Sequence, residues 1–105
     1  MAVIEAYESN FDTLIQDDYV IVDFYGDHCG ACVAMEPHYL AASNDLAMIR
    51  FLKVNTSKEK ALGERFNIAA LPTVFFMRNG EIVEKVIGGM DKEMLYPHIS
   101  KMLYE

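Results

Sequence analysis

The chain has 105 residues, of which 52% are hydrophobic and 24% are charged, as is typical of one globular domain with a sizeable core. Its net charge of −7 disfavours nonspecific nucleic-acid binding, which needs clustered lysines and arginines. No apolar run approaches the roughly 18 residues of a membrane-spanning helix, and the N-terminus lacks the pattern of a secretory signal. We therefore expect a single domain, residues 1–105, that is cytoplasmic and monomeric.

Strand and helix patterns alternate through the first half of the chain. Ser9-Asn10 offers an N-cap for a first helix, and a β-branched and aromatic run at 19–25 predicts a buried strand. Pro37 falls inside the next predicted helix. The strands are expected at 2–6, 19–25 and 50–55, and the later helices at 31–47 and 58–66.

The second half predicts a hairpin and a final helix. Asn79-Gly80 is a strong two-residue turn signal between apolar strands at 73–77 and 82–87. Gly88-Gly89 ends the second strand, and Asp91 caps the last helix, in which Pro97 should cause a kink or a delayed start. The apolar face of that helix comprises Leu95, Ile99, Met102 and Leu103.

The element order β-α-β-α-β-α-β-β-α defines the expected fold class. Alternating units imply parallel strands with right-handed crossovers, whereas the last hairpin must be antiparallel. We predict an α/β fold with a central mixed sheet and helices on both faces.

The two cysteines, Cys29 and Cys32, lie between the strand at 19–25 and the following helix. A bridge between them would close a tiny loop and add little stability, so the pair is more plausibly chemical than structural. A helix N-terminus favours thiolate over thiol. We expect Cys29 to be the exposed nucleophile and Cys32, one turn deeper, the shielded resolving thiol.

The alternatives for this pair are half of a zinc site or two inert thiols. A structural zinc site needs four ligands, and the three histidines offer no second ligand pair at matching spacing. We therefore favour a redox pair and predict no metal.

Asp23 stands inside an apolar strand, where burial of a carboxylate is costly. A buried carboxyl beneath the cysteines would have a raised pKa and could exchange a proton with Cys32. The alternative is a structural aspartate paired with a lysine. Lys53, on a neighbouring apolar strand, is a candidate partner for Asp23.

Leu71-Pro72-Thr73 places a proline at the start of a central strand. A cis bond there would leave the Leu71 backbone free to pair with an extended peptide. A simple strand-start proline is the alternative, and the residues alone favour it, since about 5–6% of X–Pro bonds are cis.

Taken together, these motifs resemble the thioredoxin family, and the resemblance covers nearly the whole chain. The matching motifs are, in order, Val22-Asp23-Phe24, Cys29-Gly30-x-Cys32, Pro37, Lys53, Leu71-Pro72-Thr73, Asn79-Gly80 and Gly88.

The resemblance implies a role for each matching residue. Cys29 would attack a substrate disulfide, and Cys32 would displace the reduced product. Asp23 would relay a proton to Cys32, with Lys53 tuning it. Pro72 would be cis and pack against the cysteines. Leu71 would hold the substrate chain through its backbone, Gly88 would keep the docking groove open, and Pro37 would kink the active-site helix.

The active-site segment departs from the family's usual Trp-Cys-Gly-Pro-Cys. Here His28 precedes Cys29, Gly30 is kept, and Ala31 replaces the proline, while Tyr25 replaces a frequent tryptophan. A protonated His28 would stabilise the Cys29 thiolate, and a stabilised dithiol is more oxidising. Asp27 acts in the opposite direction, and an exposed His28 ring without this effect is the alternative. We predict a reduction potential about 10–50 mV above the roughly −270 mV of ordinary thioredoxin.

The resemblance implies a protein-disulfide reductase that needs no bound cofactor and receives electrons from a flavoprotein reductase using NADPH. Its partners would be disulfide-containing proteins. An oxidant or isomerase, and a non-catalytic binding module with the same fold, are the alternatives.

Overall fold

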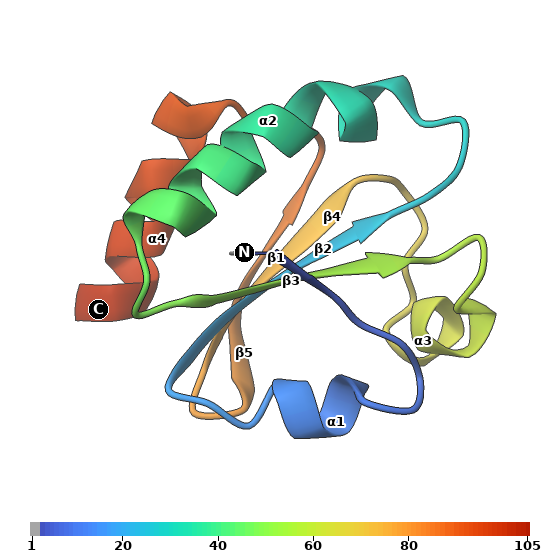
Figure 1. Ribbon diagram of the computed structural model, residues 1–105, viewed down its shortest axis with the longest axis horizontal. Coiled ribbons are helices and arrows are strands. Elements are labelled where there is room, and N and C mark those ends of the chain that lie inside the picture. Colours follow the sequence, from blue (N-terminus) through green and yellow to red (C-terminus); the bar gives the residue numbers. More distant parts are fainter. Residues whose placement is uncertain (1–2) are drawn as a thin grey trace.

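Five strands form one mixed sheet in the computed structural model, which describes residues 3–105 (Figure 1). The strands are β1 (Val3–Glu5), β2 (Tyr19–Tyr25), β3 (Arg50–Asn55), β4 (Thr73–Arg78) and β5 (Glu81–Ile87). Their order in the sheet is β1-β3-β2-β4-β5, with β1, β3 and β2 parallel and the β4–β5 hairpin antiparallel. The predicted mixed sheet is confirmed.

Helices cover both faces of this sheet. They are α1 (Phe11–Leu14), α2 (Gly30–Asp45), α3 (Lys60–Arg65) and α4 (Lys92–Tyr104). Helices α2 and α4 lie on one face, and α1 and α3 lie on the other (Figure 1). None of these helices is long and apolar enough to cross a lipid bilayer.

The core consists of two apolar clusters, one on each face, because successive strand residues point to opposite sides. The α2/α4 face buries Ile21, Phe51 and Phe76 against the two long helices. The α1/α3 face buries Val22, Phe24 and other apolar strand residues beneath the short helices. The nearly continuous apolar run of β2 is explained by burial on both faces.

Element boundaries differ from the predictions by one or two residues. Helix α2 begins at Gly30, because Cys29 is its N-cap, and it ends at Asp45. Helix α3 is limited to Lys60–Arg65. Strand β1 begins at Val3, and Ala2 of the predicted strand lies outside the described residues.

The N-termini of α1 and α4 differ in how their backbone N–H groups are capped. Asn10 occupies the N-cap position of α1, but its side chain accepts a hydrogen bond from the backbone of Tyr7 at 2.7 Å and caps no helical N–H. Asp91 caps α4 as predicted, accepting from the Met94 N–H at 2.9 Å. This cap starts α4 at Lys92, so of the two effects predicted from Pro97, a kink or a delayed start, the delayed start is wrong.

The β4–β5 turn follows the prediction from sequence. Asn79 and Gly80 both have positive φ, 53° and 82°. That pair of conformations defines the tight hairpin turn whose twist matches the flanking strands. The turn fixes β5 beside β4. It brings Ile87 level with Thr73 at the end of the sheet where β2 leads into the cysteine segment.

Candidate active site

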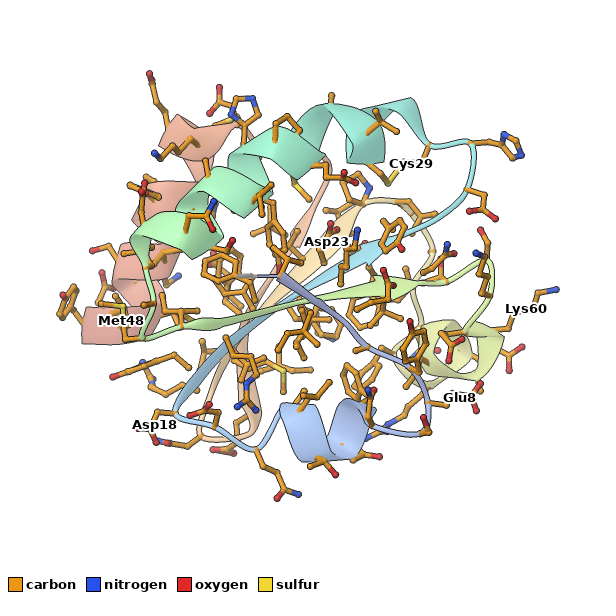
Figure 2. All side chains as sticks on the ribbon, in the orientation of Figure 1. Glu8, Asp18, Asp23, Cys29, Met48 and Lys60 are labelled. Carbon is orange, nitrogen blue, oxygen red and sulfur yellow. A yellow bond between two sulfur atoms is a disulfide. The ribbon has the colours of Figure 1, made fainter. Side chains whose placement is uncertain are left out.

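Cys29 and Cys32 form a disulfide where β2 leads into α2 (Figure 2). Their Cα atoms are 5.3 Å apart, within the usual range for a disulfide. Cys29 is partly exposed, whereas Cys32 is only 5% exposed. The bridge therefore presents one accessible sulfur backed by a buried one, the order expected from the sequence.

The N-terminus of α2 supplies the electrostatics of the Cys29 sulfur. Cys29 is the N-cap, and its Sγ accepts a hydrogen bond from the Cys32 N–H at 3.2 Å. Free N–H groups of a first helical turn and the helix dipole stabilise negative charge. In the reduced protein the same position favours a Cys29 thiolate, which is the reactive form.

Two loops border the cysteine pair. The Leu71–Pro72 peptide bond is cis, as the resemblance implies, and Pro72 is buried. The Gly88 N–H donates to the Pro72 carbonyl at 2.8 Å, which ties the end of β5 to this loop. Gly88 has a φ of +105° and open space where a side chain would stand. Glycine suits that conformation because a Cβ would strain it.

Two other glycines allow close approaches around the site. A Cβ at Gly89 would lie 3.4 Å from the carbonyl oxygen of Ala31, so the loop after β5 abuts the cysteine segment. A Cβ at Gly26 would lie 2.7 Å from Cδ1 of Leu71, so any side chain there would force the Leu71 side chain to move. Gly89 was predicted only to end the strand at 82–87, and no role was predicted for Gly26, although it directly follows the buried strand.

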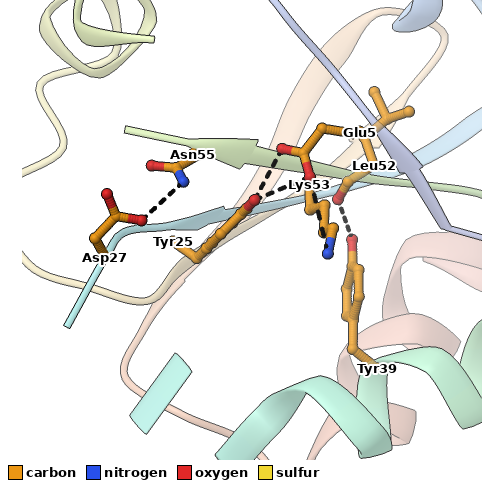
Figure 3. Close-up of polar contacts among 7 residues, drawn as sticks. All are labelled: Glu5, Tyr25, Asp27, Tyr39, Leu52, Lys53 and Asn55. Carbon is orange, nitrogen blue, oxygen red and sulfur yellow. Dashed lines mark hydrogen bonds and ion pairs between the residues drawn. The ribbon is translucent and has the colours of Figure 1, made fainter. Parts of the chain in front are cut away.

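The residues just before Cys29 are held by the end of β3. Asp27 accepts a hydrogen bond from the Asn55 amide at 3.2 Å (Figure 3). Its backbone N–H donates to the Ser57 hydroxyl at 2.9 Å. His28 is exposed and has a φ of +58°, an uncommon conformation for a residue with a Cβ. The Asp27 carboxylate is thus a fixed negative charge two residues from Cys29.

Asp23 is buried on the face of the sheet that α2 covers (Figure 2). It is 5% exposed, and within residues 3–105 its Oδ1 atom has no hydrogen-bond partner. Burial raises the pKa of the Asp23 carboxyl to about 7, with the Lys53 charge opposing this rise and Glu36 and Glu5 adding to it. The prediction of a buried aspartate with a raised pKa is confirmed.

Lys53 is level with Asp23 in the β2–β3 register, but its ammonium forms an ion pair with Glu5 of β1, Nζ to Oε1 at 3.8 Å. Lys53 therefore makes its ion pair with Glu5 and not with Asp23, although its charge still lowers the pKa of the Asp23 carboxyl from a distance. Glu5 could not be found from the sequence, because nothing local to residues 3–5 indicates which strand lies beside β1.

Two exposed apolar side chains near the cysteines were also missed. Val33, directly after Cys32, is 70% exposed, and Ile87, directly before Gly88, is 72% exposed. Strand alternation could have found Ile87, since its neighbour Val86 points to the core. Elsewhere, within residues 3–105, no group of three or more His, Cys, Asp and Glu side chains is arranged to hold a metal ion.

An accessible sulfur backed by a buried one can form a mixed disulfide with a substrate and then release it. Together with the α/β fold, this pair defines the class of protein: a thiol–disulfide oxidoreductase.

Comparison with known proteins narrows the class to a family. The family model described as Thioredoxin matches residues 2–101. Thioredoxin from Staphylococcus saprophyticus is 33% identical over 105 residues, covering 98% of this chain and all of the relative. Thioredoxin 1 from Plasmodium falciparum is 32% identical over 95 residues, covering 90% and 91%. The crystal structure of Chlamydomonas reinhardtii thioredoxin f2 has a TM-score of 0.87 at 30% identity, covering 94% of each chain. The chain belongs to the thioredoxin family.

Proposed function

We propose that this oxidoreductase reduces disulfide bonds in client proteins, with Cys29 as the nucleophile and Cys32 as the resolving thiol. Proteins of the thioredoxin family act on disulfide-containing clients. The observation that carries the proposal is the difference in exposure between the partly exposed Cys29 at the helix N-terminus and the buried Cys32.

The reaction balances as two successive exchanges. The Cys29 thiolate attacks one sulfur of the client disulfide, forming a Cys29–client disulfide and releasing a client thiolate, which takes up a proton. Cys32 then loses its proton and attacks the Cys29 sulfur. The Cys29–Cys32 disulfide forms, and the second client thiolate leaves. Two electrons pass from the protein to the client.

Asp23 is proposed to accept the Cys32 proton in the second exchange and to return it when the disulfide is reduced again. A base is most effective when its pKa lies near the working pH, and the pKa of about 7 for Asp23 meets that condition. Its position six residues before Cys29, on the strand that leads into the site, supports the assignment.

The client chain is proposed to bind along the cis-proline loop. Pairing of an extended peptide with the Leu71 backbone would resemble the addition of a strand to a sheet edge. Val33 and Ile87 offer apolar contacts beside the cysteines, and the open space at Gly88 leaves room for the client.

Electrons are proposed to come from a flavoprotein reductase that uses NADPH, with no cofactor bound by this chain. We further propose that the protein works in the cytoplasm. Both of its cysteines belong to the redox pair, and the chain has no cysteine left for a structural disulfide of the kind typical of oxidising compartments.

The experiment is a turnover assay with a disulfide-containing protein and dithiothreitol as electron donor. Cys29→Ser is expected to reduce turnover to the uncatalysed rate, because no other thiol is exposed. Cys32→Ser is expected to accumulate a mixed disulfide between Cys29 and the client, detectable by mass spectrometry. A Cys29→Ser variant with wild-type turnover contradicts the proposal.

A further inference from the structure

Three charged residues form a row across three neighbouring strands. Glu5 of β1 is level with Lys53 of β3, and Lys53 is level with Asp23 of β2. On the same face, the residues two positions earlier in these strands are apolar: Val3, Phe51 and Ile21. The row therefore marks the point at which the α2-facing side of the sheet changes from apolar to charged, and one ammonium lies between two carboxyl groups.

The Lys53 ammonium forms an ion pair with Glu5 (Figure 3). Its Nζ lies 3.8 Å from Oε1 of Glu5 and 5.3 Å from the ring centroid of Tyr25. The Tyr25 hydroxyl donates to Oε1 and Oε2 of Glu5 at 2.9 and 3.0 Å, which fixes the carboxylate. Lys53 and Glu5 are each 29% exposed, so water screens their attraction only in part.

No other element packed against Asp23 supplies it with a cation, within the described part of the chain. The β4 residue beside it is Val74. Helix α2 brings the negative charge of Glu36 and the hydroxyl of Tyr39 toward it. The Tyr39 hydroxyl donates to backbone carbonyls and not to the Asp23 side chain. It lies 3.0 Å from the Ile21 carbonyl and 2.7 Å from the Leu52 carbonyl. Cys32 lies one helical turn before Glu36 on the same helix.

We propose that Glu5 is a positioning residue: it holds the Lys53 ammonium in an ion pair of its own, so that Lys53 acts on the buried Asp23 carboxyl only from a distance and Asp23 can exchange a proton with Cys32. This inference rests on the proposed role of Asp23 in the dithiol reaction. A direct Lys53–Asp23 ion pair would keep the aspartate ionised and make it a weaker base. With Lys53 bound to Glu5, the Asp23 oxygen takes the proton as the Cys32 sulfur attacks, and returns it when the disulfide is reduced.

The test uses Glu5→Gln, whose amide oxygen can still accept the Tyr25 hydroxyl but carries no charge. Without the anion, the Lys53 charge is uncompensated and acts on Asp23. The midpoint of the Asp23 titration, followed by the carboxyl carbon resonance in the oxidised protein, is expected to fall by about one pH unit. The pH profile of thiol release from the mixed disulfide should move by the same amount.

Three further variants make the test specific. Lys53→Gln is expected to move the Asp23 midpoint upward. In the Glu5→Gln, Lys53→Gln double variant, the effect of Glu5 should shrink to less than half, because it acts mainly through Lys53. Glu64→Gln, an exposed glutamate on α3, is the control for loss of one negative charge and should change nothing.

Each result has one meaning. An unchanged Asp23 midpoint in Glu5→Gln overturns the role of Glu5, and so does a shift of the same size in the double variant. A shifted midpoint with an unchanged pH profile overturns the proposed proton role of Asp23. If Cys32→Ser forms no mixed disulfide between Cys29 and the client, the proposed function itself is overturned.

Discussion

The two faces of β2 differ in what they contribute. On the α1/α3 face the strand presents Val20, Val22 and Phe24, all fully buried among apolar neighbours. On the α2/α4 face it presents Ile21, Asp23 and Tyr25, so that side becomes polar toward the cysteines. One continuous strand thus supplies stability from one face and chemistry from the other, and substitutions at adjacent residues should have opposite effects.

The largest expected effect is on the apolar face. Phe24 packs against Phe75 and Phe66 with ring centroids 4.8 and 5.7 Å apart, and it is fully buried. Phe24→Ala is expected to lower the free energy of unfolding by about 3–5 kcal/mol, measured by urea denaturation. Phe24→Leu, which leaves a smaller cavity, should cost less. A loss below about 1 kcal/mol for the alanine variant would contradict the assignment of this face to stability.

Substitution of Asp23, on the other face of β2, should stabilise the protein. The pKa of Asp23 rises from an ordinary value of 3.8 to about 7 on folding. The folded state therefore holds a proton that the unfolded chain releases, and stability falls as pH rises between these values. Asp23→Asn is expected to raise the free energy of unfolding by about 2–4 kcal/mol at pH 8, measured by urea denaturation.

The control for Asp23→Asn is the same measurement at pH 4, where the gain should largely disappear because Asp23 is protonated in the folded protein. A gain that is independent of pH would mean that the carboxyl is not the source of the difference. Below pH 4 the two proteins should unfold at similar urea concentrations.

The redox potential should show a smaller effect. Ala31 lies in the first turn of α2 and keeps the N–H that a proline would lack. With His28 beside Cys29, we expect a potential about 10–50 mV above −270 mV, equivalent to about 0.5–2 kcal/mol. Ala31→Pro should lower it. Equilibration with glutathione buffers measures both proteins, and a wild-type value at or below −270 mV would contradict the prediction.

The smallest effect is expected at the surface of the α1/α3 side. Arg65 donates two hydrogen bonds to Asp12 at 2.8 and 3.1 Å, which lowers the pKa of Asp12, but these side chains are 47% and 63% exposed. Asp12→Asn is expected to cost less than about 1 kcal/mol, because water and salt screen such pairs. Urea denaturation at low and high salt tests this, and a larger, salt-independent loss would contradict it.

Much of the fold follows from local sequence. Strand β2 is an unbroken apolar run, the Asn79-Gly80 turn needs positive φ at both residues, and the Asp91 side chain caps α4. Each of these features depends on neighbouring residues alone, so the pattern predicts it. The redox pair is equally local, because three-residue spacing at a helix start brings Cys29 and Cys32 together.

Features that join distant segments were predicted less well. Lys53 is level with two carboxyl groups, and its choice of Glu5 depends on the three-residue strand β1 and on the Tyr25 hydroxyl. The approach of Leu71 to Gly26 likewise requires the packed loops. The delayed start of α4 was predicted wrongly because the turn before Pro97 is held by tertiary packing, with Leu95 fully buried, in addition to the Asp91 cap.

Strand β1 lies at the edge of the sheet and pairs with β3 through three residues. A chain shortened to begin after residue 5 would keep the cysteines, Asp23, Lys53 and the cis-proline loop. It would nevertheless lose the anion that pairs with Lys53, and with it the arrangement that we propose for proton exchange at Asp23. For protein engineering, the functional boundary of this domain therefore lies at its first strand, more than twenty residues before the first cysteine.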